Sequence, residues 1–109
     1  MKKNLILMAI LVLILVVFVA CDADKAVEKK LYGRWQHKEE STVAELIFDK
    51  DGYLTRNTYE DGEKVDSWTY EWSVSGSDIV IKVGPFISKE AFVLDGNKLT
   101  IAEITYLKV

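Results

Sequence analysis

The chain has 109 residues, half of them hydrophobic, and its 17 acidic residues outnumber its 14 basic ones. This length allows one domain with a small core. The acidic balance excludes nucleic acid as a partner, because no basic patch is available to neutralise phosphates. Without Lys2 and Lys3, which lie in the leading segment, the basic count falls from 14 to 12, and the net charge of the remaining chain is −5.

The leading segment has the order of a bacterial export signal. A short head with two lysines is followed by residues 5–20, which carry no charged side chain, and then by Cys21. This order predicts a lipoprotein signal peptide at residues 1–20, with Cys21 as the mature N-terminus carrying palmitate-type acyl chains. An uncleaved membrane anchor and an ordinary signal peptide are the alternatives. We therefore expect a protein anchored in the cell membrane, on its extracytoplasmic side.

Residues 21–31 are predicted to tether the domain to the membrane. Cys21 is the only cysteine, so lipid modification also accounts for an odd cysteine in an exported chain, and the domain behind it has no disulfide. Val27 and Leu31 lie four positions apart, so a short helix could lay one apolar edge on the domain. A solvated spacer is the alternative.

From residue 32 to residue 109, apolar and polar residues alternate with the period of two that is typical of strands. Turn sequences such as Asp51-Gly52, Asp61-Gly62 and Gly84-Pro85 separate the alternating runs. The predicted strands are Gly33–His37, Thr42–Asp49, Tyr53–Glu60, Val65–Val74, Asp78–Val83, Phe86–Leu94, Leu99–Ala102 and Ile104–Lys108. Seven or eight short strands predict an all-β, up-and-down meander, and closure into a small barrel removes its exposed edges.

Three short motifs carry a resemblance to a known family. Gly33-Arg34-Trp35 opens the first strand, Phe48-Asp49-Lys50-Asp51-Gly52 ends the second, and Gly96-Asn97-Lys98-Leu99 forms a late hairpin. With these motifs, residues 31–109 resemble the small lipocalin-like domains of bacterial lipoproteins, whose role is undefined. The resemblance implies an up-and-down barrel with a one-ended cavity, and larger relatives carry small apolar ligands.

Four aromatic residues are the candidates for ligand binding. Trp35 lies on the first strand, and Trp68, Tyr70 and Trp72 occupy alternate positions of one strand, so they share one face. Large aromatics on one face supply the bulk that a small core without disulfides needs, so we expect these residues to be buried. The alternative is a surface that stacks on an apolar ligand or a sugar.

An acidic hairpin is the candidate for contact with a partner protein, and its four carboxylates are Glu60, Asp61, Glu63 and Asp66. A solvated loop is the simpler interpretation. His37 is the only histidine, and without a second imidazole or a cysteine it predicts neither a zinc site nor a catalytic triad. We expect no metal, no cofactor and no enzymatic activity.

Two functions fit these observations. The sequence favours a protein-interaction or inhibitor-type module of the cell envelope, because about 75 residues of barrel leave little room inside. The alternative is a lipocalin-like binding or carrier module for a small apolar ligand or a sugar. The volume of the interior distinguishes the two, because ligand pockets typically enclose about 300–1,000 Å³.

Overall fold

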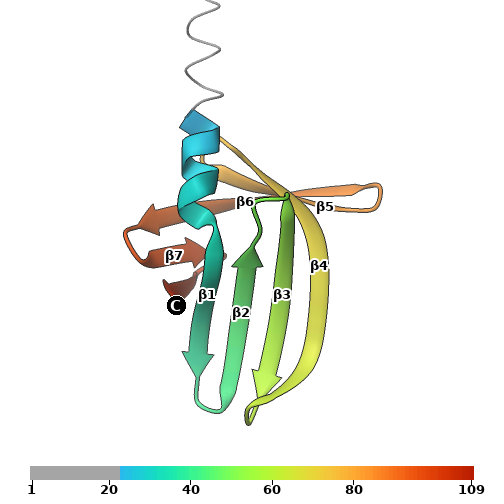
Figure 1. Ribbon diagram of the computed structural model, residues 1–109, viewed down its shortest axis with the longest axis vertical. Coiled ribbons are helices and arrows are strands. Elements are labelled where there is room, and N and C mark those ends of the chain that lie inside the picture. The colour runs from blue at the N-terminus through green and yellow to red at the C-terminus, as the bar shows by residue number, and fades with distance from the viewer. Residues whose placement is uncertain (1–22) are drawn as a thin grey trace, which may run out of the picture.

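The computed structural model describes residues 23–109, which form a short helix followed by an antiparallel meander of strands (Figure 1). Each strand pairs with the next, and β8 pairs with β1, so the described strands form a closed barrel of eight. The strands are β1 Gly33–Glu39, β2 Thr42–Phe48, β3 Tyr53–Glu60, β4 Glu63–Ser75, β5 Asp78–Val83, β6 Phe86–Asp95, β7 Lys98–Ile101 and β8 Ile104–Lys108. The predicted all-β meander barrel is confirmed.

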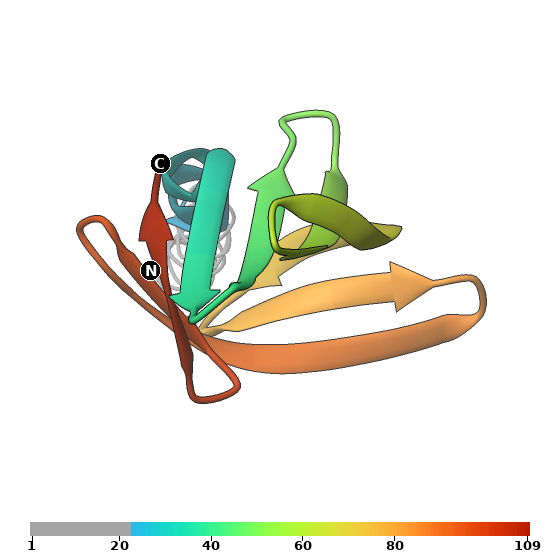
Figure 2. The ribbon, with the colours of Figure 1, turned by 90° about the horizontal axis from the view of Figure 1, so that it is seen from below.

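The barrel has two walls that cross each other. β1 to β4 run along the long axis of the molecule, while β5 to β7 run across it (Figures 1 and 2). β4 joins the two walls, because β3 pairs along most of its length while β5 pairs only with Glu71–Ser75. The seam between β1 and β8 is short, and Trp35 opposite Lys108 forms one of its two register pairs.

The Asp-Gly turn between β3 and β4 has the predicted chemistry. Asp61 and Gly62 both have positive φ, 52° and 83°, as a two-residue hairpin turn of the primed type requires. Ala102 and Glu103 form a similar turn between β7 and β8 with φ of 50° and 66°. Neither of them is a glycine or an asparagine, so this second turn carries backbone strain that Asp61-Gly62 avoids.

A helix covers one end of the barrel, where the sequence left a short helix and a solvated spacer open as alternatives. The helix extends through residues 23–31 and ends on Leu31, which is fully buried. Glu28 accepts a hydrogen bond from the Val74 amide at 3.0 Å, and Asp24 accepts one from the Gly76 amide at 3.1 Å. These two bonds fix the helix over the turn between β4 and β5.

Trp35 ties the helix to the barrel. Its indole nitrogen donates to the Leu31 carbonyl at 2.9 Å, and the Lys108 ammonium lies 5.0 Å from its ring centre. The same ammonium donates to the carbonyls of Lys30 and Tyr32, at 3.3 and 3.0 Å. A lysine that bonds the last carbonyls of a helix stabilises its C-terminus. The sequence predicted Trp35 to be buried, with ligand contact as the alternative, and the structure places it in the core.

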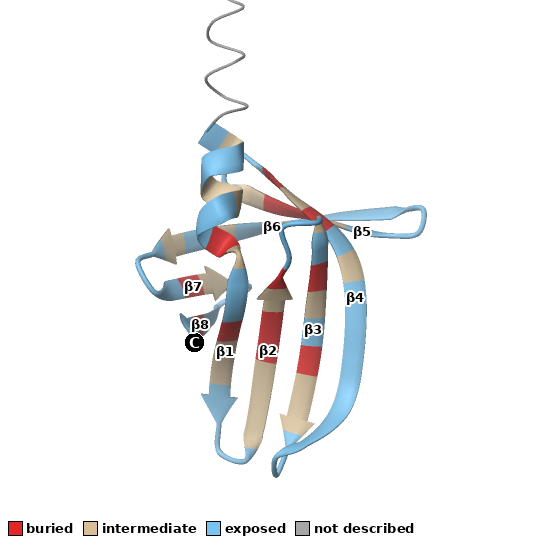
Figure 3. Cartoon of the chain, viewed as in Figure 1, coloured by how far each residue is buried: buried red, intermediate tan, exposed pale blue. Residues whose placement is uncertain are grey.

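The core fills the half of the barrel next to the helix (Figure 3). Phe48 and Trp72 stack edge to face with ring centres 4.8 Å apart, and Tyr32 meets Trp72 in the same way at 6.1 Å. Ile79 and Leu99 are fully buried beside them. Bulky aromatics thus close the helix end, while the far end of the barrel depends on smaller side chains.

The expectation that Trp68, Tyr70 and Trp72 are all buried is wrong for Trp68. Trp72 is buried and Tyr70 half-buried, but Trp68 is 56% exposed. The three side chains share the inner face, as alternation predicts. However, β5 pairs only with the later part of β4, so the inner face at Trp68 has no opposing wall.

The signal peptide predicted at residues 1–20 and the lipid site predicted at Cys21 lie outside the described residues. Within residues 23–109, no helix has the length and hydrophobicity needed to cross a membrane.

Candidate functional site

A cavity of about 380 Å³, open to solvent, lies between the two walls of the barrel. Strands of both walls contribute to it, since every second residue of a strand faces inward. Most of its lining is apolar, from Leu46, Leu54, Ile79, Ile81, Val83, Ile101, Ala102 and Ile104. Five polar residues complete the lining, namely Arg56, Tyr70, Ser88, Glu90 and Tyr106.

The cavity exists because of the sizes of the inward-facing side chains. On β4, the aromatic ring of Trp72 packs against Phe48 and fills the helix end of the barrel. At the other end, Ile81 and Ile101 are half-buried, and the turn residue Ala102 lies at the rim. Aliphatic side chains of this length do not reach across the barrel, so they line a space instead of filling it.

The polar groups of the cavity could orient a ligand. The ring of Tyr106 is buried, but its hydroxyl reaches solvent and makes none of the hydrogen bonds found in residues 23–109. Burial raises the pKa of Tyr106 above its ordinary value of 10.0, and the positive charge of Arg56 partly opposes this rise. Tyr106 therefore stays protonated at neutral pH and can donate a hydrogen bond, while Arg56 supplies a positive charge.

His37 lies beside this site without forming a catalytic pair. Its ring centre is 6.1 Å from that of Tyr106, and its Nδ1 lies 2.9 Å from the Thr105 carbonyl oxygen. Glu39, its nearest carboxylate, is 3.9 Å away and exposed. Within the described part of the chain, no three His, Cys, Asp or Glu side chains gather as a metal site.

Only one of the four aromatic candidates reaches the cavity. Tyr70 lines it, whereas Trp35 and Trp72 belong to the core at the helix end. Trp68 lies outside the lining, and its indole nitrogen donates to Asp66 at 2.9 Å. Alternation predicted correctly that Trp68, Tyr70 and Trp72 share one face of β4. It did not predict how far along the barrel each side chain lies.

The acidic hairpin forms the exposed tip between β3 and β4, at the end of the barrel away from the helix. Asp66 accepts hydrogen bonds from the Ser67 amide at 3.0 Å and from Trp68. The other three carboxylates, Glu60, Asp61 and Glu63, are exposed and form no ion pair in residues 23–109. The four residues are thus near one another and open to solvent.

Sequence reasoning missed a buried carboxylate on the outer face of the first wall. Glu45 is only 3% exposed. Its two oxygens accept hydrogen bonds from Gln36 at 2.8 Å, Asn57 at 3.1 Å and Tyr59 at 3.4 Å, and Arg34 forms an ion pair with it at 3.5 Å. Alternation places Glu45 on the outer face, and only the lengths of its cross-strand neighbours could have indicated its burial.

Two solved structures of bacterial proteins share this fold. The NMR structure of a protein from Bacteroides thetaiotaomicron has a TM-score of 0.66 at 22% identity, over 75% of this chain and 91% of that chain. The crystal structure of lipoprotein YedD from Klebsiella pneumoniae has a TM-score of 0.55 at 19% identity, over 72% and 71% of the two chains. The sequence matches no protein-family model and no curated protein. At these identities the likeness establishes the fold alone.

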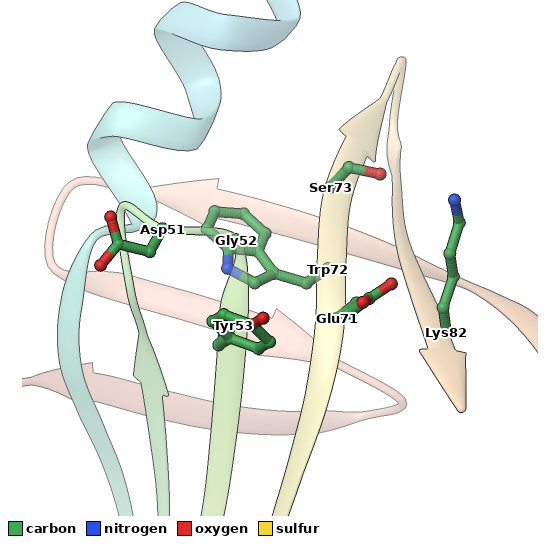
Figure 4. Close-up of a pocket in the computed structure, with 7 residues that line it drawn as sticks. All are labelled: Asp51, Gly52, Tyr53, Glu71, Trp72, Ser73 and Lys82. Carbon is green, nitrogen blue, oxygen red and sulfur yellow. The ribbon is translucent and has the colours of Figure 1, made fainter. Parts of the chain in front are cut away.

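A second hollow, of about 200 Å³, lies on the outer surface beside the turn between β2 and β3 (Figure 4). Tyr53, Glu71 and Lys82 occupy adjacent register positions on three neighbouring strands there. Trp72 forms its floor, and the indole nitrogen of Trp72 donates to the Asp49 carbonyl at 3.2 Å. The hollow is smaller and more polar than the interior cavity, so the interior cavity is the better candidate for a binding site.

Proposed function

We propose that this protein is a lipid-anchored lipoprotein of the cell envelope whose lipocalin-like barrel binds a small apolar molecule. The observation that carries the proposal is the interior cavity of about 380 Å³. The sequence favoured a filled barrel and hence an interaction module. Because the interior is instead partly open, the carrier interpretation is the better supported of the two.

The cavity has the composition of a binding site for an apolar molecule. Its volume lies within the range of about 300–1,000 Å³ that is typical of ligand pockets. Eight of its lining residues are apolar, and a small number of polar groups, among them Arg56 and Tyr106, could fix the orientation of the ligand.

The helix end of the site is closed by packed side chains, and entry is from the opposite end. The turn residue Ala102 and the strand ends Val83 and Ile104 belong to the lining. A ligand would therefore enter past Ala102, Val83 and Ile104, away from the helix.

Anchoring through Cys21 is the second part of this proposal. It is supported by the basic head, the apolar run and the cysteine at residues 1–21, and a lipoprotein of the same fold exists in Klebsiella pneumoniae. We expect the intact mass of protein extracted from membranes to show the loss of residues 1–20 and the addition of acyl chains. Cys21→Ser should leave the uncleaved precursor. A mature chain that begins elsewhere and partitions into the aqueous phase of a detergent would contradict this expectation.

Ligand binding should raise the melting temperature of residues 22–109. A straight-chain alcohol such as decanol is a suitable apolar probe, because it has one polar group and a flexible body. At a free concentration ten times its Kd, it should stabilise the folded state by about 1.4 kcal/mol. For a domain of this size, Tm should then rise by roughly 5–10 °C in a calorimetric scan.

A matched pair of variants shows whether the probe enters the cavity. Ile81→Phe adds volume inside the cavity and should remove most of the rise in Tm. Val93→Phe adds the same kind of side chain on β6, where Val93 is exposed on the outer face, and should leave the rise unchanged. A rise that persists in Ile81→Phe, or no rise in the wild type, would refute binding in the interior.

A protein-interaction or inhibitor-type module remains the second candidate. The observation that favours it is the solvent-exposed acidic hairpin with Glu60, Asp61, Glu63 and Asp66. Rim charges of this kind mainly accelerate association with a basic partner. This candidate gains support if no apolar probe stabilises the barrel, because the two functions place the binding surface on different parts of the molecule.

A further inference from the structure

The tip of the β5–β6 hairpin exposes large apolar side chains, of which only Val83 also lines the cavity. Phe86 is 74% exposed, Ile87 64% and Val83 47%. They flank the turn Gly84-Pro85. Large apolar side chains grouped at one exposed place usually mark a site of contact with a membrane or a partner.

The hairpin projects from the body of the barrel (Figures 1 and 2). On β5, pairing with β4 ends at Lys82. On β6, pairing with β7 involves only Phe92–Asp95. The tip around Val83 and Phe86 is therefore a two-stranded ribbon with no further strand on either side.

Apolar residues occupy both faces of this ribbon. Val83 and Phe86 are register partners on the inner face, and Ile87 pairs with Lys82 on the outer face. A flat protein surface would cover one face of the ribbon and leave the other in water. A medium that surrounds the tip would bury both faces, and the hydrocarbon of a bilayer is such a medium.

The charges around the tip favour an anionic surface. Lys82 and Lys89 flank the apolar residues, and residues 79–89 contain no carboxylate, although the chain after residue 20 has a net charge of −5. Glu71 lies opposite Lys82 on β4, but within residues 23–109 neither lysine forms an ion pair. Lysine side chains can keep their ammonium groups among lipid headgroups while their stems lie along apolar surface.

We propose that the β5–β6 tip inserts into the surface of an anionic phospholipid bilayer, with Val83, Phe86 and Ile87 in the apolar region and Lys82 and Lys89 at the phosphates. The carboxylates of the acidic hairpin lie between β3 and β4 and not at this tip, so they do not repel the bilayer where the tip inserts. An anchor at Cys21 would hold the tip at high local concentration next to the membrane. The inference does not require a ligand in the cavity.

The test uses the full chain reconstituted into vesicles of phosphatidylglycerol and phosphatidylcholine in equal amounts, with bromine on the acyl chains. Phe86→Trp places a fluorophore at the tip. Val93→Trp is the matched control, because Val93 is 65% exposed on the same strand but away from the tip. After subtraction of the wild-type tryptophan signal, lipid bromine should quench the tip tryptophan and leave the control near its unquenched value.

Lys82→Gln with Lys89→Gln tests the contribution of charge. Each basic residue near an anionic surface contributes roughly fivefold to binding. The equilibrium constant for docking of the tip should therefore fall by about 30-fold, while Tm stays unchanged. Vesicles of phosphatidylcholine alone should have a similar effect. Equal quenching of Phe86→Trp and Val93→Trp would overturn the proposal. A blue-shifted tip tryptophan that lipid bromine does not quench would also overturn it, and would indicate contact with a protein.

Discussion

Replacing Trp35 by alanine is expected to lower the free energy of unfolding by about 3–5 kcal/mol, as large-to-small changes in a packed core do. Trp35 is fully buried, its indole nitrogen bonds the Leu31 carbonyl, and Lys108 lies over its ring. The substitution leaves a cavity where the helix, β1 and β8 meet. Because domains of this size are stable by only about 5–10 kcal/mol, urea denaturation of residues 22–109 should show a large loss.

Trp35→Phe separates packing from hydrogen bonding at this position. It keeps most of the ring volume but removes the indole donor, so we expect a loss of about 1–2 kcal/mol. If Trp35→Ala instead lost less than about 1 kcal/mol, as surface changes do, the side chain would not hold the helix to the barrel.

Replacing Glu45 by alanine should have the second largest effect, on the order of 2–3 kcal/mol. Gln36, Asn57 and Tyr59 all donate to this carboxylate. Without it, these donors lose their acceptor in a place where water has little access. Glu39→Ala is the matched control, because that carboxylate is exposed on the neighbouring strand, and it should change the free energy of unfolding by less than about 0.5 kcal/mol.

The contribution of Glu45 should depend on pH. Burial acts to raise its pKa, but hydrogen bonds from Gln36, Asn57 and Tyr59 and the charge of Arg34 outweigh burial, so the pKa lies below its ordinary value of 4.5. A carboxyl with a lowered pKa in the folded state stabilises the fold above its ordinary pKa, and this stability is lost as the pH falls through the folded-state pKa.

Comparison with Glu45→Gln measures this dependence. The stability advantage of the wild type over Glu45→Gln should be full at about pH 6 and should shrink toward about pH 3. Equilibrium unfolding in urea at a series of pH values checks the result. An advantage that grows on acidification would have the wrong sign and would contradict the hydrogen-bonded carboxylate.

The strands and their faces were predictable from local pattern. Alternation placed Trp68, Tyr70 and Trp72 on one face, and Asp61-Gly62 identified a hairpin turn by its backbone preference. These features depend on a few neighbouring residues. The closure of β8 on β1, in contrast, involves residues more than 70 positions apart and could only be inferred from the number of strands.

Burial along each strand was not predictable in the same way. Trp68 and Trp72 lie on the same face of β4, yet one is exposed and the other buried, because β5 covers only part of β4. Glu45 lies on the outer face and is nevertheless buried by its cross-strand neighbours. Both outcomes depend on where distant strands begin and end, which the period of two does not encode.

The cavity was also beyond the reach of sequence pattern. Chain length suggested a filled barrel. However, the interior volume depends on how the two walls cross and on which end of the barrel holds the aromatic rings. Trp72 and Phe48 share the layer next to the helix. The opposite layer receives aliphatic residues such as Ile81 and Ile101, and the space left there is the proposed binding site.

Isoleucine methyl NMR of residues 22–109 during titration with decanol tests the binding of an apolar molecule in the interior most directly. The methyls of Ile81, Ile101 and Ile104 line the cavity, while Ile47 lies on the outer face of β2 and Ile87 at the exposed hairpin tip. Binding inside the barrel predicts saturable shifts of the first three methyls and constant positions for the other two. Shifts confined to Ile47 and Ile87, or no saturable shift at all, would contradict the binding function.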